Sequence, residues 1–164
     1  MLIDKNFTSW IEGLSKEYKK AQIKAAIKVN GELISFYLKL GEEIANTSYK
    51  ATYGSNFFSM VSAELKKRFP ESKGFSSRNI YYTEQFYTKY KEILHQVVAK
   101  LVLVPWGHHI MLITKCKNME QSLYYLDKII EKRTDKKSMG FGAEVLIAFL
   151  CNLETELQDV SIIM

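Results

Sequence analysis

The feature that most constrains the fold is a helical pattern of apolar residues that fills residues 7–47. Apolar side chains recur there at spacings of three and four, which is typical of an α-helix with a buried face. A second apolar set widens the stripe, so we expect burial on more than one side of the helix. The first set is Leu14, Tyr18, Ala21, Ala25, Val29, Leu33, Phe36, Tyr37, Leu40 and Ile44, and the second is Ile23, Ile27, Ile34 and Leu38.

An unbroken helix from Leu14 to Ile44 would be about 45 Å long at a rise of 1.5 Å per residue. That is longer than a small domain needs to cover itself. Either the helix breaks near Asn30-Gly31 or Gly41, since glycine weakens a helix interior, or it packs against a second subunit. We favour a long helix that packs antiparallel or forms a dimer, and therefore a homo-oligomer.

Two shorter helices with a turn between them are predicted next. The first spans Ser55 to Phe69, and a turn from Pro70 to Ser76 leads to a second helix that Ser76 or Ser77 can cap. The apolar face of this second helix is formed by Ile80, Thr83, Phe86, Tyr87, Tyr90, Ile93 and Leu94. Its opposite face carries hydrogen-bonding side chains and no carboxylate. This order of elements is typical of a DNA-binding helix-turn-helix.

The candidate nucleic-acid contacts divide into two groups. The basic run at the end of the first helix, together with one lysine of the turn, suits phosphates: Lys66, Lys67, Arg68 and Lys73. The second helix would face a groove with Ser77, Arg78, Asn79, Tyr81, Gln85 and Lys89. A structural interpretation is also complete, because helix pairs are common and basic residues suit the negative end of a helix dipole.

The rest of the chain is also predicted to be helical. The second helix continues to about Leu101, and residues 102–104 leave the helix before Pro105, with a short strand possible there. Further helices follow from Trp106 and from a cap at Asn118. We therefore expect an all-α fold, in which a long N-terminal helix packs on a helix-turn-helix-like bundle. This domain covers residues 1–133, followed by a linker at 134–142 and an amphipathic C-terminal helix at 143–164.

The charge distribution favours an acidic partner. The net charge is +5, and residues 51–100 carry 8 Lys and Arg against 4 Asp and Glu, the largest excess in the chain. A basic surface is typical of nucleic-acid binding, although a charged helix face is often only solvated. Cys116 and Cys151 are predicted to be reduced, and neither a signal peptide nor a membrane span is evident. We expect a cytoplasmic protein that does not contact a membrane.

No catalytic constellation is evident. His95, His108 and His109 have no cysteine or paired carboxylate at ligand spacing. We interpret Trp106-Gly107-His108 as a packed indole with a capping imidazole. Glu64-Leu65-Lys66 matches the Glu-x-Lys of metal-dependent nucleases, but it lies on a predicted helix and lacks the strand that such a site needs. We expect no metal, no cofactor and no catalysis.

An ordered set of short motifs resembles the N-terminal domain of the YhcG family, bacterial proteins whose C-terminal half is a nuclease-type domain of the PDDEXK class. The match covers residues 14 to about 131, and neither the tail beyond Arg133 nor the nuclease domain is matched. It comprises Val29-Asn30, Glu32-Leu33-Ile34, Tyr37, Gly41, Ile44, Tyr53-Gly54, Leu65 to Pro70, Gly74-Phe75-Ser76, Arg78-Asn79, Phe86-Tyr87, Tyr90 and Val104 to His108.

The resemblance implies a helical targeting module that binds nucleic acid, namely double-stranded DNA, on behalf of a nuclease domain or a partner protein. The alternative is a helical module for protein–protein interaction or dimerisation through residues 14–44, with no direct nucleic-acid contact. An all-α metalloenzyme is a third and more distant possibility.

Overall fold

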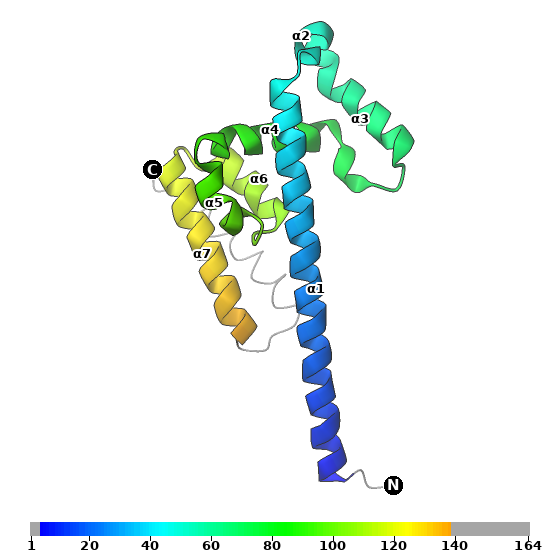
Figure 1. Ribbon diagram of the computed structural model, residues 1–164, viewed down its shortest axis with the longest axis vertical. Coiled ribbons are helices and arrows are strands. Elements are labelled where there is room, and N and C mark those ends of the chain that lie inside the picture. The colour runs from blue at the N-terminus through cyan, green and yellow to red at the C-terminus, as the bar shows by residue number, and fades with distance from the viewer. Residues whose placement is uncertain (1–3, 139–164) are drawn as a thin grey trace.

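The computed structural model describes residues 4–138, with side chains described through residue 133. Helix α1, Lys5–Asn46, runs unbroken for 42 residues, and Asp4 caps it by accepting a hydrogen bond from the Asn6 N–H at 3.2 Å. The N-terminal half of α1 projects far beyond the other described elements (Figure 1). The breaks considered at Gly31 and Gly41 therefore do not occur.

The described residues are helices joined by short turns, with no strand among residues 4–138, which confirms the all-α prediction. Residues 102–104, where a strand was considered, form a turn. None of the described helices is long and apolar enough to cross a membrane. After α1 the elements are α2 (Tyr49–Tyr53), η1 (Gly54–Asn56), α3 (Phe57–Arg68), η2 (Lys73–Phe75), α4 (Ser77–Tyr90), η3 (Lys91–Ile93), α5 (Leu94–Leu101), α6 (Trp106–Lys115) and α7 (Met119–Ser138), where η denotes a 3₁₀ turn.

Two predicted boundaries differ from the structure. The helix that begins at Ser77 does not continue to Leu101, because η3 interrupts it and α5 leaves in a new direction (Figure 1). This turn lets Val97 and Leu101 enter the core. Helix α7 extends through residues 134–138, which were assigned to the linker; this segment contains neither glycine nor proline. The rest of the predicted linker and the predicted C-terminal helix lie outside the described residues.

The crossing of α1 and α4 holds the fold together, and it depends on Gly41. A Cβ added at Gly41 would lie 2.1 Å from the Thr83 carbonyl oxygen and 2.9 Å from the Tyr87 Cβ. Only glycine allows the two helix backbones to approach this closely. The side of α1 that faces the bundle is buried around this crossing, through Ile34, Tyr37, Leu38 and Ile44.

A second link joins α1 to the turn between α5 and α6. The Asn30 side-chain amide donates to the Val102 carbonyl at 3.0 Å and to the Val104 carbonyl at 3.2 Å. These carbonyls belong to the turn at residues 102–104, so the Asn30 amide fixes that turn to α1. The main core then forms between α1, α4, α5, α6 and α7.

Helix α3 packs beside this core on a smaller apolar cluster. Phe57 of α3 meets Ile44 of α1 and Ile80 of α4. The Ser62 hydroxyl donates to the Phe75 carbonyl at 2.6 Å and so fixes η2 against α3. The turn between α3 and α4 is therefore held in place from both sides.

Candidate nucleic-acid interface

Helix α4 begins at a side-chain cap. The Ser76 hydroxyl accepts a hydrogen bond from the Asn79 N–H at 3.1 Å, which selects Ser76 over Ser77 as the cap. Ile80, Thr83, Phe86 and Tyr90 of α4 are then fully buried, as the helical spacing predicts. The opposite side of α4 carries the predicted groove-facing residues.

The N-terminal half of that outer side is exposed. Arg78 is exposed, and its Nε donates to the Tyr82 hydroxyl at 3.2 Å, with the guanidinium 5.6 Å from the Tyr82 ring centre. Tyr81 is 43% exposed, and its ring packs edge-on against Phe58 of α3 at 5.5 Å. Tyr82 was missing from the predicted contacts, although its position four residues after Arg78 places both side chains on one side of a helix.

The C-terminal half of the outer side is less accessible. Gln85 and Lys89 are only partly exposed. Burial lowers the pKa of the Lys89 ammonium, and the lysine lies close enough to Cys116, just after α6, for the two groups to interact. The two halves of the predicted site therefore differ, because α6 and the residues after it cover part of α4.

Asn79 has a structural position that the prediction did not foresee. Its amide nitrogen donates to the Gly74 carbonyl at 2.6 Å, and its amide oxygen accepts from the Trp106 indole N–H, also at 2.6 Å. Both ends of the amide are thus used inside the protein, joining η2 to α6. Ser77, in the first turn of α4, is partly exposed.

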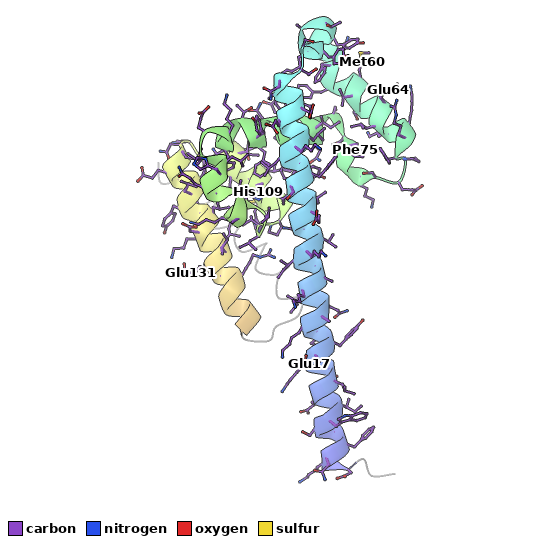
Figure 2. The ribbon with its side chains drawn as sticks, viewed as in Figure 1. Glu17, Met60, Glu64, Phe75, His109 and Glu131 are labelled. Carbon is purple, nitrogen blue, oxygen red and sulfur yellow. The ribbon has the colours of Figure 1, made fainter. Side chains whose placement is uncertain are left out.

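The basic residues of α3 are exposed, but two of them are paired. Lys67 and Arg68 form ion pairs with Glu64 at 2.6 and 3.2 Å, and the hydrogen bond and charge of Lys67 hold the pKa of the Glu64 carboxyl below its usual value. Glu64 lies on the outside of α3 (Figure 2). Among the described residues, neither Lys66 nor Lys73 has a carboxylate within ion-pair distance.

The single carboxylate of α4 is turned away from the candidate interface. Glu84 is buried and forms an ion pair with Lys50 of α2, whose ammonium also lies 5.7 Å from the Phe58 ring centre. Lys50 thus neutralises Glu84 where α2, α3 and α4 meet. The outer side of α4 keeps no negative charge that would repel phosphate.

Trp106 packs as predicted, whereas His108 does not cap. The indole lies against Tyr37 at 4.5 Å and Phe86 at 5.3 Å. Pro105 stands at the N-cap of α6, so His108 is inside the helix, buried, with neither ring nitrogen hydrogen-bonded. Burial lowers the pKa of His108, and that of His109 inside the bundle (Figure 2), to about 4. Within residues 4–133 no three His, Cys, Asp or Glu side chains gather as a metal site would require.

The motifs behind the family resemblance coincide with these structural contacts. Asn30 and Gly41 fix α1 to its neighbours, and Asn79 and Trp106 bond to each other. Gly74 has a similar role, because a Cβ there would lie 2.7 Å from the Tyr37 hydroxyl. Several of the resembling residues therefore hold the helices in this packing.

Comparison with known proteins agrees with the resemblance. The family model named DUF1016 N-terminal domain matches residues 13–144, which extends beyond the segment matched by motifs and is consistent with a YhcG-like N-terminal domain. No curated protein and no solved structure matches the chain. Because the model spans most of the sequence, from the exposed half of α1 through α7, the chain belongs to the DUF1016 N-terminal domain family.

Proposed function

We propose that the unit formed by α3, η2 and α4 binds nucleic acid, and double-stranded DNA in particular. Lys66, Lys67, Arg68 and Lys73 contact phosphates, and Arg78 with Tyr81 enters a groove. The observation that supports this proposal most is the start of α4, which carries an exposed guanidinium and two tyrosines. The one carboxylate of α4, that of Glu84, is buried in an ion pair with Lys50. An exposed surface with an excess of cations attracts a polyanion.

The exposure of each side chain divides the proposed contacts into two groups. Arg78 and Tyr81 are exposed, so they are the primary groove-facing residues, and Gln85 and Lys89 act only where the duplex reaches the half-buried end of α4. Asn79 keeps its two internal hydrogen bonds and acts by holding η2. Lys67 and Arg68 exchange Glu64 for phosphate, which is favourable because the pairs are exposed and weak in water.

The test compares three variants of the full chain by fluorescence anisotropy with labelled duplexes at two salt concentrations. Arg78→Ala weakens binding to a preferred duplex by about 1–3 kcal/mol and relaxes sequence preference. Lys67→Ala weakens binding to all sequences alike and reduces the salt slope by about one unit. Lys128→Ala on α7, whose lysine is in a comparable ion pair with Glu131, is the matched control and leaves binding unchanged.

Two outcomes would overturn the proposal. Wild-type protein that shows no salt-sensitive binding to DNA or RNA at low salt would end it. Equal losses of duplex affinity in Lys67→Ala and Lys128→Ala would show that only the net charge of the protein matters, with no binding site on α3.

The second candidate is a helical interaction module, and a different observation favours it. Large apolar side chains remain exposed along α1, on the side opposite the bundle. In this reading the chain joins a nuclease domain or another protein to its target without contacting nucleic acid. Under both proposals the chain itself is non-catalytic and acts in the cytoplasm.

A further inference from the structure

Helix α1 has two apolar sides, and the bundle uses only one of them. The inner side, centred on Ile34, Leu38 and Gly41, is buried. At 3.6 residues per turn, the second side points roughly 180° away from it. We call this second side the outer stripe, and its large members are all at least 40% exposed.

The outer stripe begins on the part of α1 that projects from the bundle. Residues 5–22 are exposed throughout, over roughly 27 Å of helix. This free arm carries Phe7, Trp10, Ile11, Leu14 and Tyr18, which are 40–66% exposed. A row of large apolar side chains left in water is typical of an interaction surface, so the free arm calls for a partner.

The stripe continues onto the half of α1 that the bundle supports. Ala21 and Ala25 are exposed in the middle, and Val29, Leu33 and Phe36 follow with 69%, 40% and 44% exposure. The apolar residues therefore recur at helical spacing over both halves of α1, from residue 7 to residue 36. A long helix with an apolar stripe of its own would match this surface along its length.

We propose that the partner is a second copy of this chain, paired antiparallel through the outer stripe. Four pairs of the stripe are symmetric on reversal: Phe7 and Phe36, Trp10 and Leu33, Leu14 and Val29, and Tyr18 and Ala25 are each equidistant from the midpoint between Ala21 and Gln22. Ile11 is the exception, because its counterpart is Glu32. A two-fold axis at that midpoint sets each residue beside its counterpart, and the large Tyr18 meets the small Ala25. Self-complementarity of this kind is what a two-fold interface requires.

Charge selects the antiparallel orientation. Glu17 and Lys28 flank the outer stripe on the same side, and antiparallel pairing brings these flanks together. In the register above, Glu17 of one copy lies about 3 Å along the axis from Lys28 of the other, within reach of both side chains. Parallel pairing would instead place Glu17 beside the opposite flank, which carries Ser15 and Gln22 and no cation near the stripe. In the single chain Glu17 lies on the exposed arm (Figure 2) and forms an ion pair with Lys20 at 2.8 Å. Exposed pairs of this kind are weak in water, so Glu17 can exchange Lys20 for Lys28 of the other copy.

The pairing leaves the crossing of α1 and α4 intact. Since the outer stripe points away from the inner side, each copy keeps its own α4 on Gly41, and the free arm of one copy covers Val29, Leu33 and Phe36 of the other. The arm then ends beside η2, because the Phe36 ring lies 6.3 Å from the Phe75 ring. Each free arm thereby gains a second helix along its apolar side.

The experiment measures mass and register on the full chain, with Cys151→Ser as the background. Light scattering of wild type is expected to give twice the 19.0 kDa of one chain. Leu14→Glu raises the protein concentration at which half of the chains are dimeric by at least about tenfold, because a charge replaces a side chain that the dimer buries. Lys16→Glu, on the opposite side of the same exposed arm, is the matched control and keeps the dimer. Both residues are exposed in the single chain, so neither change affects its core.

Disulfide cross-linking then tests the orientation. When the Leu14→Cys and Val29→Cys proteins are mixed, they are expected to cross-link to each other. The Lys16→Cys protein, mixed with Val29→Cys in the same way, is expected not to cross-link. Glu17→Lys weakens the dimer, and adding Lys28→Glu restores it. Preferential 14–14 cross-links would overturn the antiparallel register. Wild-type protein that stays monomeric at 100 times the concentrations used for binding assays would overturn the pairing. This holds also if residues 143–164, and not a second copy, cover the stripe.

Discussion

The substitution Gly41→Ala tests the crossing on which this fold depends. A Cβ at position 41 would lie 2.1 Å from the Thr83 carbonyl oxygen and 2.7 Å from its carbonyl carbon, and ordinary contact begins at 3.4 Å. The obstacle is backbone, so no change of rotamer can relieve it, and α1 and α4 must move apart. We expect a loss of about 3 kcal/mol in the free energy of unfolding, at the upper end of overpacking costs. That corresponds to a melting temperature about 6–12 °C lower.

Gly13→Ala is the control, because it makes the same chemical change on the same helix. Nothing lies within 4 Å of a Cβ at position 13, which is in the exposed arm. Alanine there should raise the free energy of unfolding by about 0.5–1 kcal/mol, through helix propensity alone. Circular dichroism melts and urea titrations of the three proteins provide the measurement. If Gly41→Ala is as stable as wild type, the close approach of α1 and α4 is refuted.

Further predictions concern the buried polar groups, the helix cap and catalysis. The pKa values of His108 and His109 are both about 4 in the fold against 6.5 for a free histidine, so the unfolded chain binds more protons between these values. The His109 contribution alone is expected to lower stability by about 3 kcal/mol as pH drops from 6.5 to 4, His108 adds to this loss, and pH-dependent urea titrations would detect it. Trp106→Phe leaves the Asn79 amide oxygen without its donor and should cost about 1–3 kcal/mol in thermal melts. Ser76→Ala removes the cap of α4 at a cost of about 1 kcal/mol, measured in the same way. Incubation with Mg²⁺ or Mn²⁺ should leave DNA intact on gels, and cleavage that disappears in Glu64→Gln would contradict the non-catalytic proposal.

The sequence predicts the helices well because their apolar spacing and caps are local. Helices α3, α4 and α7 begin within a few residues of their expected positions, and Asn118 caps α7 by accepting from the Gln121 N–H at 2.8 Å. Gly41 could not be interpreted in this way. Its low helix propensity suggested a break, and only the position of Thr83, on another helix, explains why glycine is needed inside an unbroken α1.

The candidate interface shows the same division between local and tertiary information. Helical spacing correctly places Arg78 and Tyr81 on the outer side of α4. It places Lys89 there too, yet the residues around Cys116 cover it in part, and no local pattern reports this. The partner of Asn79 is the indole of Trp106, 27 positions later in the chain. A polar side chain beside Arg78 could therefore be mistaken for a base contact when its function is to hold the turn.

The two proposals make one joint prediction that neither makes alone. If two copies pair through the outer stripe, each complex carries two α3–α4 units, and a duplex long enough to reach both binds with avidity. Leu14→Glu should then weaken binding to the long duplex by about 100-fold or more, within the range that linked sites produce, and reduce its salt slope. A duplex that reaches only one unit should bind Leu14→Glu and wild type equally, because α4 is unchanged. Arg78→Ala should weaken binding to both duplexes. Equal effects of Leu14→Glu on the two lengths would show that the free arm itself contacts nucleic acid, and would refute the separation of the dimer surface from the DNA surface.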